Sequence, residues 1–416
     1  MPRGKSAATG APTAEWSPAA RGQLALLALA MVLSMTTWFS AAAVLPQLNS
    51  LWSLSSGGAA LLTIAVQLGF VAGALGSALT NLSDRYPARA VFFASSLGAA
   101  AANALVAASP TAEVAIPLRF LTGCFVAGIY PPALKIMATH YRQGRGVALG
   151  VMIGGLTIGS AMPHLVNGLG GVDWRAVVLA SSVMTTAGGL IGLALVGDGP
   201  YPFPRGTFEP RYVLRALRDP AVRLANLGYF GHMWELYAMW SWFGAYLADS
   251  LRVSGGAETS SLASLGTFVV IGVGAVGCYA GGVLGDRWGR TRTTALAMVV
   301  SGSCCVLAGP VFGQDPRLVI AFGIVWGIAV VADSAQFSTM VTELVDASYV
   351  GTALTIQMAI GFLITVGTIW LVPFARDAFG WHWTFLLLAP GPALGVIAMV
   401  QLRARPEAAR IASGLG

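Results

Sequence analysis

Apolar runs about 20 residues long recur along the chain, separated by short polar stretches. Each run is long enough to cross a bilayer as a helix. One long polar stretch, 198–223, divides the runs into six and six. The sequence therefore predicts twelve transmembrane helices, in the first half near 24–46, 59–80, 90–109, 114–137, 147–168 and 175–197, and in the second half near 224–248, 262–284, 294–313, 318–340, 352–374 and 382–402.

The composition changes the class of protein that is expected. Of the 416 residues, 56% are hydrophobic and only 10% are charged, whereas soluble domains carry about 25% charged residues. Much of the surface must therefore meet lipid, where only helices and closed barrels satisfy the backbone. We expect an all-α membrane protein.

The basic residues set the predicted orientation. With the N-terminus in the cytoplasm, 18 of the 24 Lys and Arg residues lie on the cytoplasmic side and four on the other, which is a strong positive-inside signal. The net charge of +7 is thus a topology signal, and no nucleic-acid partner is expected. The expected domains are a disordered cytoplasmic tail at 1–22, six-helix bundles at 23–197 and 224–402, a cytoplasmic central loop at 198–223 and a cytoplasmic tail at 403–416.

A short polar motif follows the second run of each half, so the halves repeat each other. Asp84 and Asp286 lie 202 residues apart, close to half the chain. The members of the motif are Asp84 and Arg85 in the first half and Gly282, Asp286, Arg287, Gly289 and Arg290 in the second.

This motif resembles the loop motif of the major facilitator superfamily, and it lies at the expected place between the second and third helices of a half. Arg119, followed by Gly123, resembles the buried-arginine motif of the same family. The fifth run only partly resembles the glycine-proline motif of antiporters, because Gly159 and Pro163 are not adjacent. The resemblance covers 23–402 and implies two pseudo-symmetric six-helix halves that rock around a central site.

In such a fold helices one, four, seven and ten line the cavity. A charged side chain inside the membrane is costly, so each one in these helices is a candidate functional residue. Arg119 either binds an anionic group, or controls proton release from a nearby acid, or pins the fold by bonding helix carbonyls. Thr37 and Trp38 in the first run can face the site. His164 in the fifth run is expected to be a buried, hydrogen-bonded histidine.

The seventh run holds the best candidate for proton coupling. His232 and Glu235 are three residues apart and share a helix face, and a carboxylate beside an imidazole can exchange a proton near neutral pH. The alternative is a polar pair that only packs the helix. In the tenth run, Asp333 either binds a cationic solute, pairs with Arg119 or His232, or pins the structure, and Gln336 would add a hydrogen bond in the cavity.

The motif residues around Asp84 and Asp286 have a different expected role. A carboxylate at a helix end can meet the positive N-terminus of another helix. The resemblance suggests that both motifs latch the two halves on the inner side, braced by their arginines. This would be gating and not contact with the solute.

The sequence therefore predicts a secondary active transporter, either a symporter or an antiporter, coupled to protons. Uptake of an organic anion and efflux of a drug or metabolite both stay open, and a solute sensor with the same fold is the alternative. The expected partners are a small solute, a proton and membrane lipid, and the protein is expected to act as a monomer. The chain shows no nucleotide-binding loop or catalytic motif, so we expect no enzyme activity, cofactor or metal. Two Lys against 22 Arg suggest a bacterial inner-membrane protein that crosses the bilayer many times.

Overall fold

The computed structural model describes residues 17–141, 145–169, 173–201, 212–213, 218–255, 259–346 and 349–416. All regular elements in these ranges are helices. The first half contains α1 (Pro18–Ser34), α2 (Ser40–Ala43), α3 (Leu45–Trp52), α4 (Ser56–Thr80), α5 (Leu82–Arg85), α6 (Ala88–Val106), α7 (Ala112–Val126), α8 (Tyr130–His140), α9 (Arg145–Gly168) and α10 (Trp174–Ala194). The second half contains α12 (Pro220–Val253), α13 (Thr259–Gly272), α14 (Gly274–Trp288), α15 (Arg290–Val311), α16 (Pro316–Ala332), α17 (Ser334–Leu344), α18 (Val350–Phe379), α19 (Trp381–Thr384), η3 (Phe385–Leu388), α20 (Pro390–Arg403) and η4 (Pro406–Gly414).

These helices form the twelve predicted spans. In the described ranges, ten of them are long and apolar enough to cross a membrane. The other two are the first span, which is broken after α1, and the seventh, α12, which carries many aromatic and polar side chains. The fourth, eighth and tenth spans are also interrupted, at α7–α8, α13–α14 and α16–α17. The prediction of an all-α fold with two six-helix halves is confirmed.

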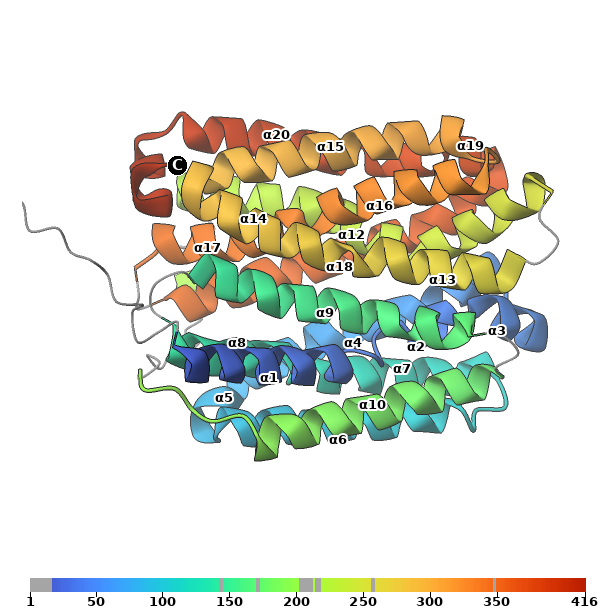
Figure 1. Ribbon diagram of the computed structural model, residues 1–416, viewed down its shortest axis with the longest axis horizontal. Helices are drawn as coiled ribbons and strands as arrows, with labels where there is room; N and C mark the ends of the chain where they lie inside the picture. Colours follow the sequence, from blue (N-terminus) through green and yellow to red (C-terminus); the bar gives the residue numbers. More distant parts are fainter. Residues whose placement is uncertain are drawn as a thin grey trace, which may run out of the picture.

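The two halves lie side by side with their helices nearly parallel (Figure 1). Where they meet, α4 packs against α18, and α9 packs against α13 and α14. We call the end of the bundle that holds α5 and η4 the inner end, and the end that holds α3 and α19 the outer end (Figure 1).

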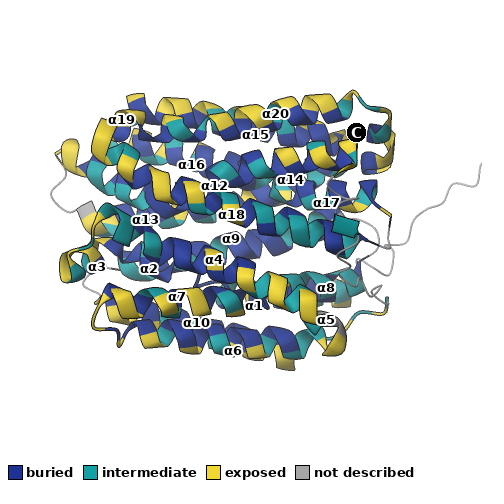
Figure 2. Ribbon diagram, turned by 180° about the vertical axis from the view of Figure 1, so that it is seen from behind, coloured by how far each residue is buried: buried dark blue, intermediate teal, exposed yellow. Residues whose placement is uncertain are grey.

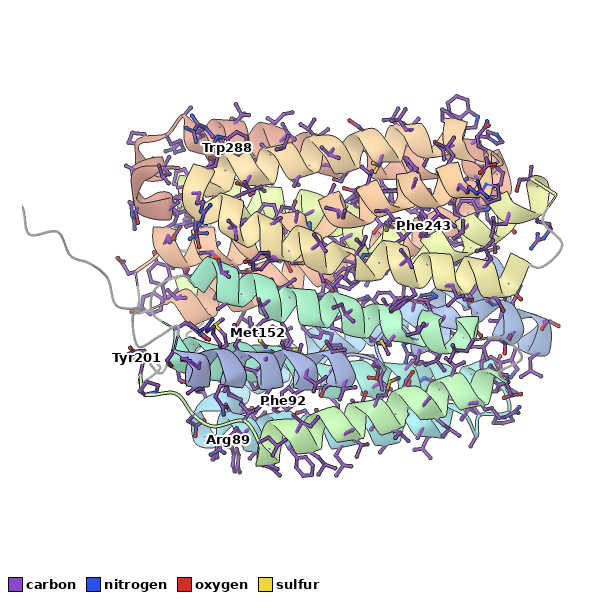
Figure 3. The ribbon with its side chains drawn as sticks, viewed as in Figure 1. Arg89, Phe92, Met152, Tyr201, Phe243 and Trp288 are labelled. Atoms are coloured by element: carbon purple, nitrogen blue, oxygen red, sulfur yellow. The ribbon has the colours of Figure 1, made fainter. Side chains whose placement is uncertain are left out.

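The burial pattern suits a membrane protein. Exposed residues gather on the outward faces of the outer helices, while the faces between helices are buried (Figure 2). Many exposed side chains are large and apolar, such as Leu79, Val183 and Leu394, so these faces match lipid. Side chains fill the spaces between the helices (Figure 3).

Close helix contact positions the buried arginine. A Cβ at Gly123 would lie 2.1 Å from the carbonyl oxygen of Val66, so only glycine allows α7 and α4 to cross this closely. Arg119 lies one turn earlier on α7 and is fully buried. The crossing therefore places its guanidinium among helices one, two and three.

Both ends of the chain differ in detail from the predicted tails. Residues 1–16 of the expected disordered tail lie outside the described residues, and α1 begins at Pro18. Most of the central loop, 202–211 and 214–217, also lies outside them. In the C-terminal tail, η4 packs against α17 with Ile411 fully buried.

Candidate functional site

A break in the first span exposes backbone carbonyls inside the bundle, because α1 ends at Ser34 and α2 begins at Ser40. Arg119 bonds these carbonyls. Its Nη1 donates to the carbonyl of Thr37 at 2.8 Å and its Nη2 to that of Trp38. Nη1 also donates to Oδ1 of Asn103 at 2.8 Å. The guanidinium thus bonds helix carbonyls, as expected if Arg119 pins the fold. Its contact with a solute stays a prediction.

Glu235 lies in a different place from the one expected. Its carboxylate faces α15 and α16, where it accepts hydrogen bonds from Nε1 of Trp326 at 2.6 Å, Oγ of Ser301 at 2.9 Å and Sγ of Cys305 at 3.3 Å. The side chain is 2% exposed. All three donors are uncharged.

His232 pairs with the tenth span. Its Nδ1 lies 2.8 Å from Oδ1 of Asp333, and its Nε2 lies 3.0 Å from Oγ of Ser334. Of the two partners expected for Asp333, Arg119 and His232, the structure places His232 beside it. The break between α16 and α17 turns Asp333 toward α12.

The expected contact between His232 and Glu235 is not formed. Residues three apart on a helix point about 60° away from each other. Here each side chain follows a different neighbour: His232 turns to Ser334 on α17, and Glu235 turns to Ser301 and Trp326 on α15 and α16. Helix seven therefore carries two separate titratable groups.

Aromatic side chains fill the boundary between the halves. Trp38 stacks on Tyr237 and Phe362 of the second half, with ring centroids 5.6 Å apart in each case. Phe70 of α4 lies 4.3 Å from Phe362, and Phe39 lies 6.0 Å from Tyr237. Trp38 and Phe39, which lie in the break of span one, thus contact helices seven and eleven.

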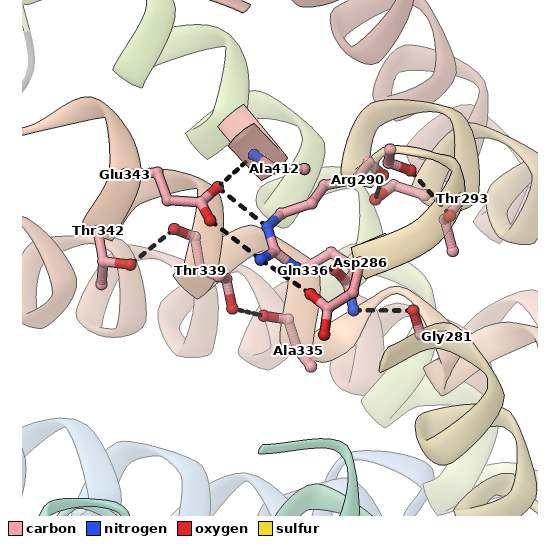
Figure 4. A network of polar contacts seen from close by, with 12 residues as sticks. Gly281, Asp286, Arg290, Thr293, Ala335, Gln336, Thr339, Thr342, Glu343 and Ala412 are labelled. Carbon is pink, nitrogen blue, oxygen red and sulfur yellow. Dashed lines mark hydrogen bonds and ion pairs between the residues drawn. The ribbon is translucent and has the colours of Figure 1, made fainter. Parts of the chain in front are cut away.

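A polar network closes the inner end of the second half (Figure 4). Arg290 donates to both carboxylate oxygens of Glu343 at 3.0 Å, to Oε1 of Gln336 at 2.9 Å, and lies 3.1 Å from Asp286. Nε2 of Gln336 donates to the carbonyl of Gly281. The amide of Gln336 is thus bonded at the inner end, and a hydrogen bond from it to a solute stays a prediction.

Asp286 also faces the other half. A Cβ at Gly146, in the first turn of α9, would lie 2.6 Å from both carboxylate oxygens of Asp286. A Cβ at Gly282 would lie 2.6 Å from the carbonyl oxygen of Gly146. The carboxylate therefore lies against the positive end of a helix from the first half, as the latch hypothesis requires.

The other motif residues lie around this contact. Gly289 has a φ of 104°, which favours glycine, and precedes α15. The side chains of Arg85 and Arg287 are exposed. The side chain of Asp84 lies outside the described residues, so the first-half copy of the latch stays a prediction.

Several site residues were missed by sequence reasoning. Asn103 is a lone amide in an alanine-rich run, a signal that was available. Ser301, Cys305 and Trp326 lie in apolar runs that give no signal of a site. Only the packing of α16 on α12, and of α15 on α16, brings them to Glu235.

We predict that Asp286→Asn slows transport several-fold and leaves the affinity for solute nearly unchanged. The substitution removes the charge that faces the N-terminus of α9, which is worth about 1 kcal/mol, and Asp286 is absent from the central aromatic contacts. Transport rate and equilibrium binding of the purified protein measure the two effects. Asp315→Asn is the matched control, since Asp315 caps α16 through the backbone NH of Arg317. Loss of equilibrium binding in folded Asp286→Asn would show that the residue belongs to the solute site.

Twelve spans in two halves, several of them broken, with charged side chains buried inside each half, are typical of an α-helical membrane transporter. The sequence profile of the Major Facilitator Superfamily matches residues 27–280 and again 225–414. The chain belongs to this family, and the resemblance inferred from its motifs is confirmed.

Individual relatives match parts of the chain. The uncharacterized transporter YgaY of Escherichia coli K12 is 32% identical over 190 residues, which cover 44% of this chain and 45% of YgaY. The multidrug efflux pump LfrA of Mycolicibacterium smegmatis is 31% identical over 144 residues, 34% of this chain and 28% of the pump. The match thus spans less than half of either relative.

A solved structure matches nearly the whole fold. The proton:xylose symporter XylE, bound to 6-bromo-6-deoxy-D-glucose, superposes with a TM-score of 0.73 over 92% of this chain and 95% of the symporter. Its sequence is only 14% identical, so this likeness concerns the fold alone.

Proposed function

We propose that this transporter couples the movement of a small solute to protons, with Glu235 and the His232–Asp333 pair as the groups that carry them. The observation that supports this most is the surroundings of Glu235, a buried carboxylate whose hydrogen-bond partners are the neutral side chains of Trp326, Ser301 and Cys305. A hydroxyl and a thiol can also accept a hydrogen bond from a protonated carboxyl group. The same pocket can therefore hold either protonation state.

Alternating access is proposed to open and close contacts at the two ends in turn. At the outer end, Nδ2 of Asn167 on α9 donates to Oγ of Ser264 on α13 at 2.9 Å, and Ser56 on α4 donates to Asp377 on α18. At the inner end, Asp286 lies against α9. Each contact joins the two halves and uses a few polar groups, so each can break as the halves rock.

The alternative, a solute sensor, keeps this fold but does not move the solute. Counterflow separates the two functions: proteoliposomes loaded with unlabelled solute are diluted into labelled solute, and uptake is followed. The solute is one that stabilises the purified protein against heating. A transporter exchanges the two pools, whereas a solute that binds and never exchanges would identify a sensor. Loading from one side at a time also gives the direction of transport.

We further propose that the inner end faces the cytoplasm of a bacterium. The excess of Arg at that end supports this orientation. In cells, Arg252→Cys at the outer end of α12 should react with an impermeant thiol reagent, and Arg287→Cys at the inner end should react only after the membrane is opened. The reverse labelling pattern would overturn the orientation.

A further inference from the structure

Six side chains buried in the first half and in helix seven carry polar atoms that have no hydrogen-bond partner in the described part of the chain. Each of these side chains is at most 4% exposed. Leaving such a group unpaired costs about 1–3 kcal/mol, so a set of them in one place indicates a binding surface. The atoms are Oγ1 of Thr37, Nε1 of Trp38, both amide atoms of Gln67, Oγ of Ser160, Nε2 of His164 and Nε1 of Trp240.

These side chains form one continuous group around the break in span one. Gln67 lies one turn before Phe70, whose ring is 5.1 Å from that of Trp38. Trp38 in turn contacts Tyr237, which is 5.6 Å from Trp240. We call this group the central polar cluster.

The group continues onto helix five. A Cβ at Gly244, one turn after Trp240, would lie 3.7 Å from Cε1 of His164. Ser160 lies one turn before His164 on α9. His164 was expected to be hydrogen-bonded, and its Nε2 has no partner among the described residues. The cluster therefore draws on helices one, two, five and seven and reaches both halves.

The buried charges of the bundle are engaged elsewhere. All three guanidinium nitrogens of Arg119 donate to protein oxygens. Both carboxylate oxygens of Glu235 accept hydrogen bonds from α15 and α16, and Asp333 lies against His232. The central polar cluster thus offers two indole NH groups, one amide, two hydroxyls and one imidazole nitrogen. A charged solute would enter this site without a counter-charge, which is costly at low dielectric.

From this arrangement we infer that the transporter's central site takes an uncharged ring solute that bears hydroxyl or amide groups. The indole NH groups of Trp38 and Trp240 require acceptors on the solute, and the amide of Gln67 takes both a donor and an acceptor. The ring of Trp38 stacks on those of Tyr237 and Phe362 across the boundary between the halves, so a flat solute can take the place of one of these ring contacts when the halves part. The inference rests on the proposed transport function only in placing the solute between the halves.

The test uses matched solutes that differ in charge. The purified full-length protein is heated with glucose, glucuronate or glucosamine, with nicotinamide, nicotinate or the cation 1-methylnicotinamide, and with uridine or its monophosphate. We expect the unfolding temperature to rise with at least one uncharged member and to rise less with its charged partners. A larger rise with a charged partner, or no rise with any uncharged member, would overturn the inference.

Three substitutions then locate the bound solute. Trp38→Phe and Trp240→Phe keep a ring and remove the NH group, and each should weaken binding about fivefold, while Gln67→Leu should weaken it about tenfold. Trp383→Phe is the control, because Trp383 is 65% exposed at the outer end. Unchanged affinity in all three variants would place the solute elsewhere.

Two outcomes separate this inference from the proposed function. A charged solute that exchanges in counterflow and moves with protons would support transport and overturn the uncharged class. An uncharged solute that depends on Trp38 and Gln67 but never exchanges would support the class and overturn transport.

Discussion

Proteoliposomes with Glu235→Gln should fail to accumulate solute on a pH step, yet should exchange it between equal pools as the parent does. The amide keeps the size of the side chain and can still accept from Trp326, but it cannot carry a proton. Exchange between equal pools needs no net proton movement, so it survives. For one proton per solute, a step of one pH unit can drive about tenfold accumulation, and the variant should only equilibrate.

The measurement is uptake with and without the pH step, beside counterflow at uniform pH. Glu113→Gln is the matched control, because Glu113 is exposed in the first turn of α7. Accumulation by Glu235→Gln equal to that of the parent would reduce Glu235 to a packing role. Asp333 beside His232 would then be the next candidate.

Arg119→Leu should lower the stability of the folded protein more than Glu235→Gln or Asp286→Asn. It removes the guanidinium donors of the carbonyls of Thr37 and Trp38 and of Oδ1 of Asn103. Oγ of Ser40 also lies within reach of the Thr37 carbonyl and of Oδ1 of Asn103, but its single proton can satisfy only one of them. Buried acceptors without partners cost about 1–3 kcal/mol each, so we expect a loss of at least about 2 kcal/mol. Thermal unfolding of the purified protein measures the loss.

Arg317→Leu is the control for this change, since Arg317 is exposed at the outer end of α16. The sequence leaves open whether Arg119 binds the solute or bonds the carbonyls of the broken helix, and the same experiment distinguishes these roles. A variant with parental stability that no longer binds solute would assign the guanidinium to the solute and not to the broken helix.

The fold followed from the sequence because lipid leaves few choices. A backbone that crosses a membrane must form helices or a barrel, so apolar runs of about 20 residues gave the spans directly. The motif around Asp286 occurs in both halves, and this repeat predicted that the halves are related by symmetry. It also predicted a contact between the halves at the inner end, where Asp286 lies against α9.

The contacts of the site were harder to predict, because they depend on breaks in helices and on neighbours distant in sequence. Nothing in residues 35–39 signals that span one stops there, and Arg119 bonds the carbonyls that this break exposes. The spacing of His232 and Glu235 suggested a pair, but spacing does not show which helix packs on each side. Gln336 lies in the tenth span, which was expected to line the cavity, yet Arg290 bonds its side chain at the inner end.

Proton-coupled transport is tested most directly by following protons and solute in the same vesicles. Proteoliposomes that contain a pH-sensitive dye receive a gradient of solute and no gradient of protons. We expect the internal pH to change as the solute moves, and the change to disappear in Glu235→Gln while counterflow persists. Solute movement in the parent protein without any change in internal pH would contradict proton coupling.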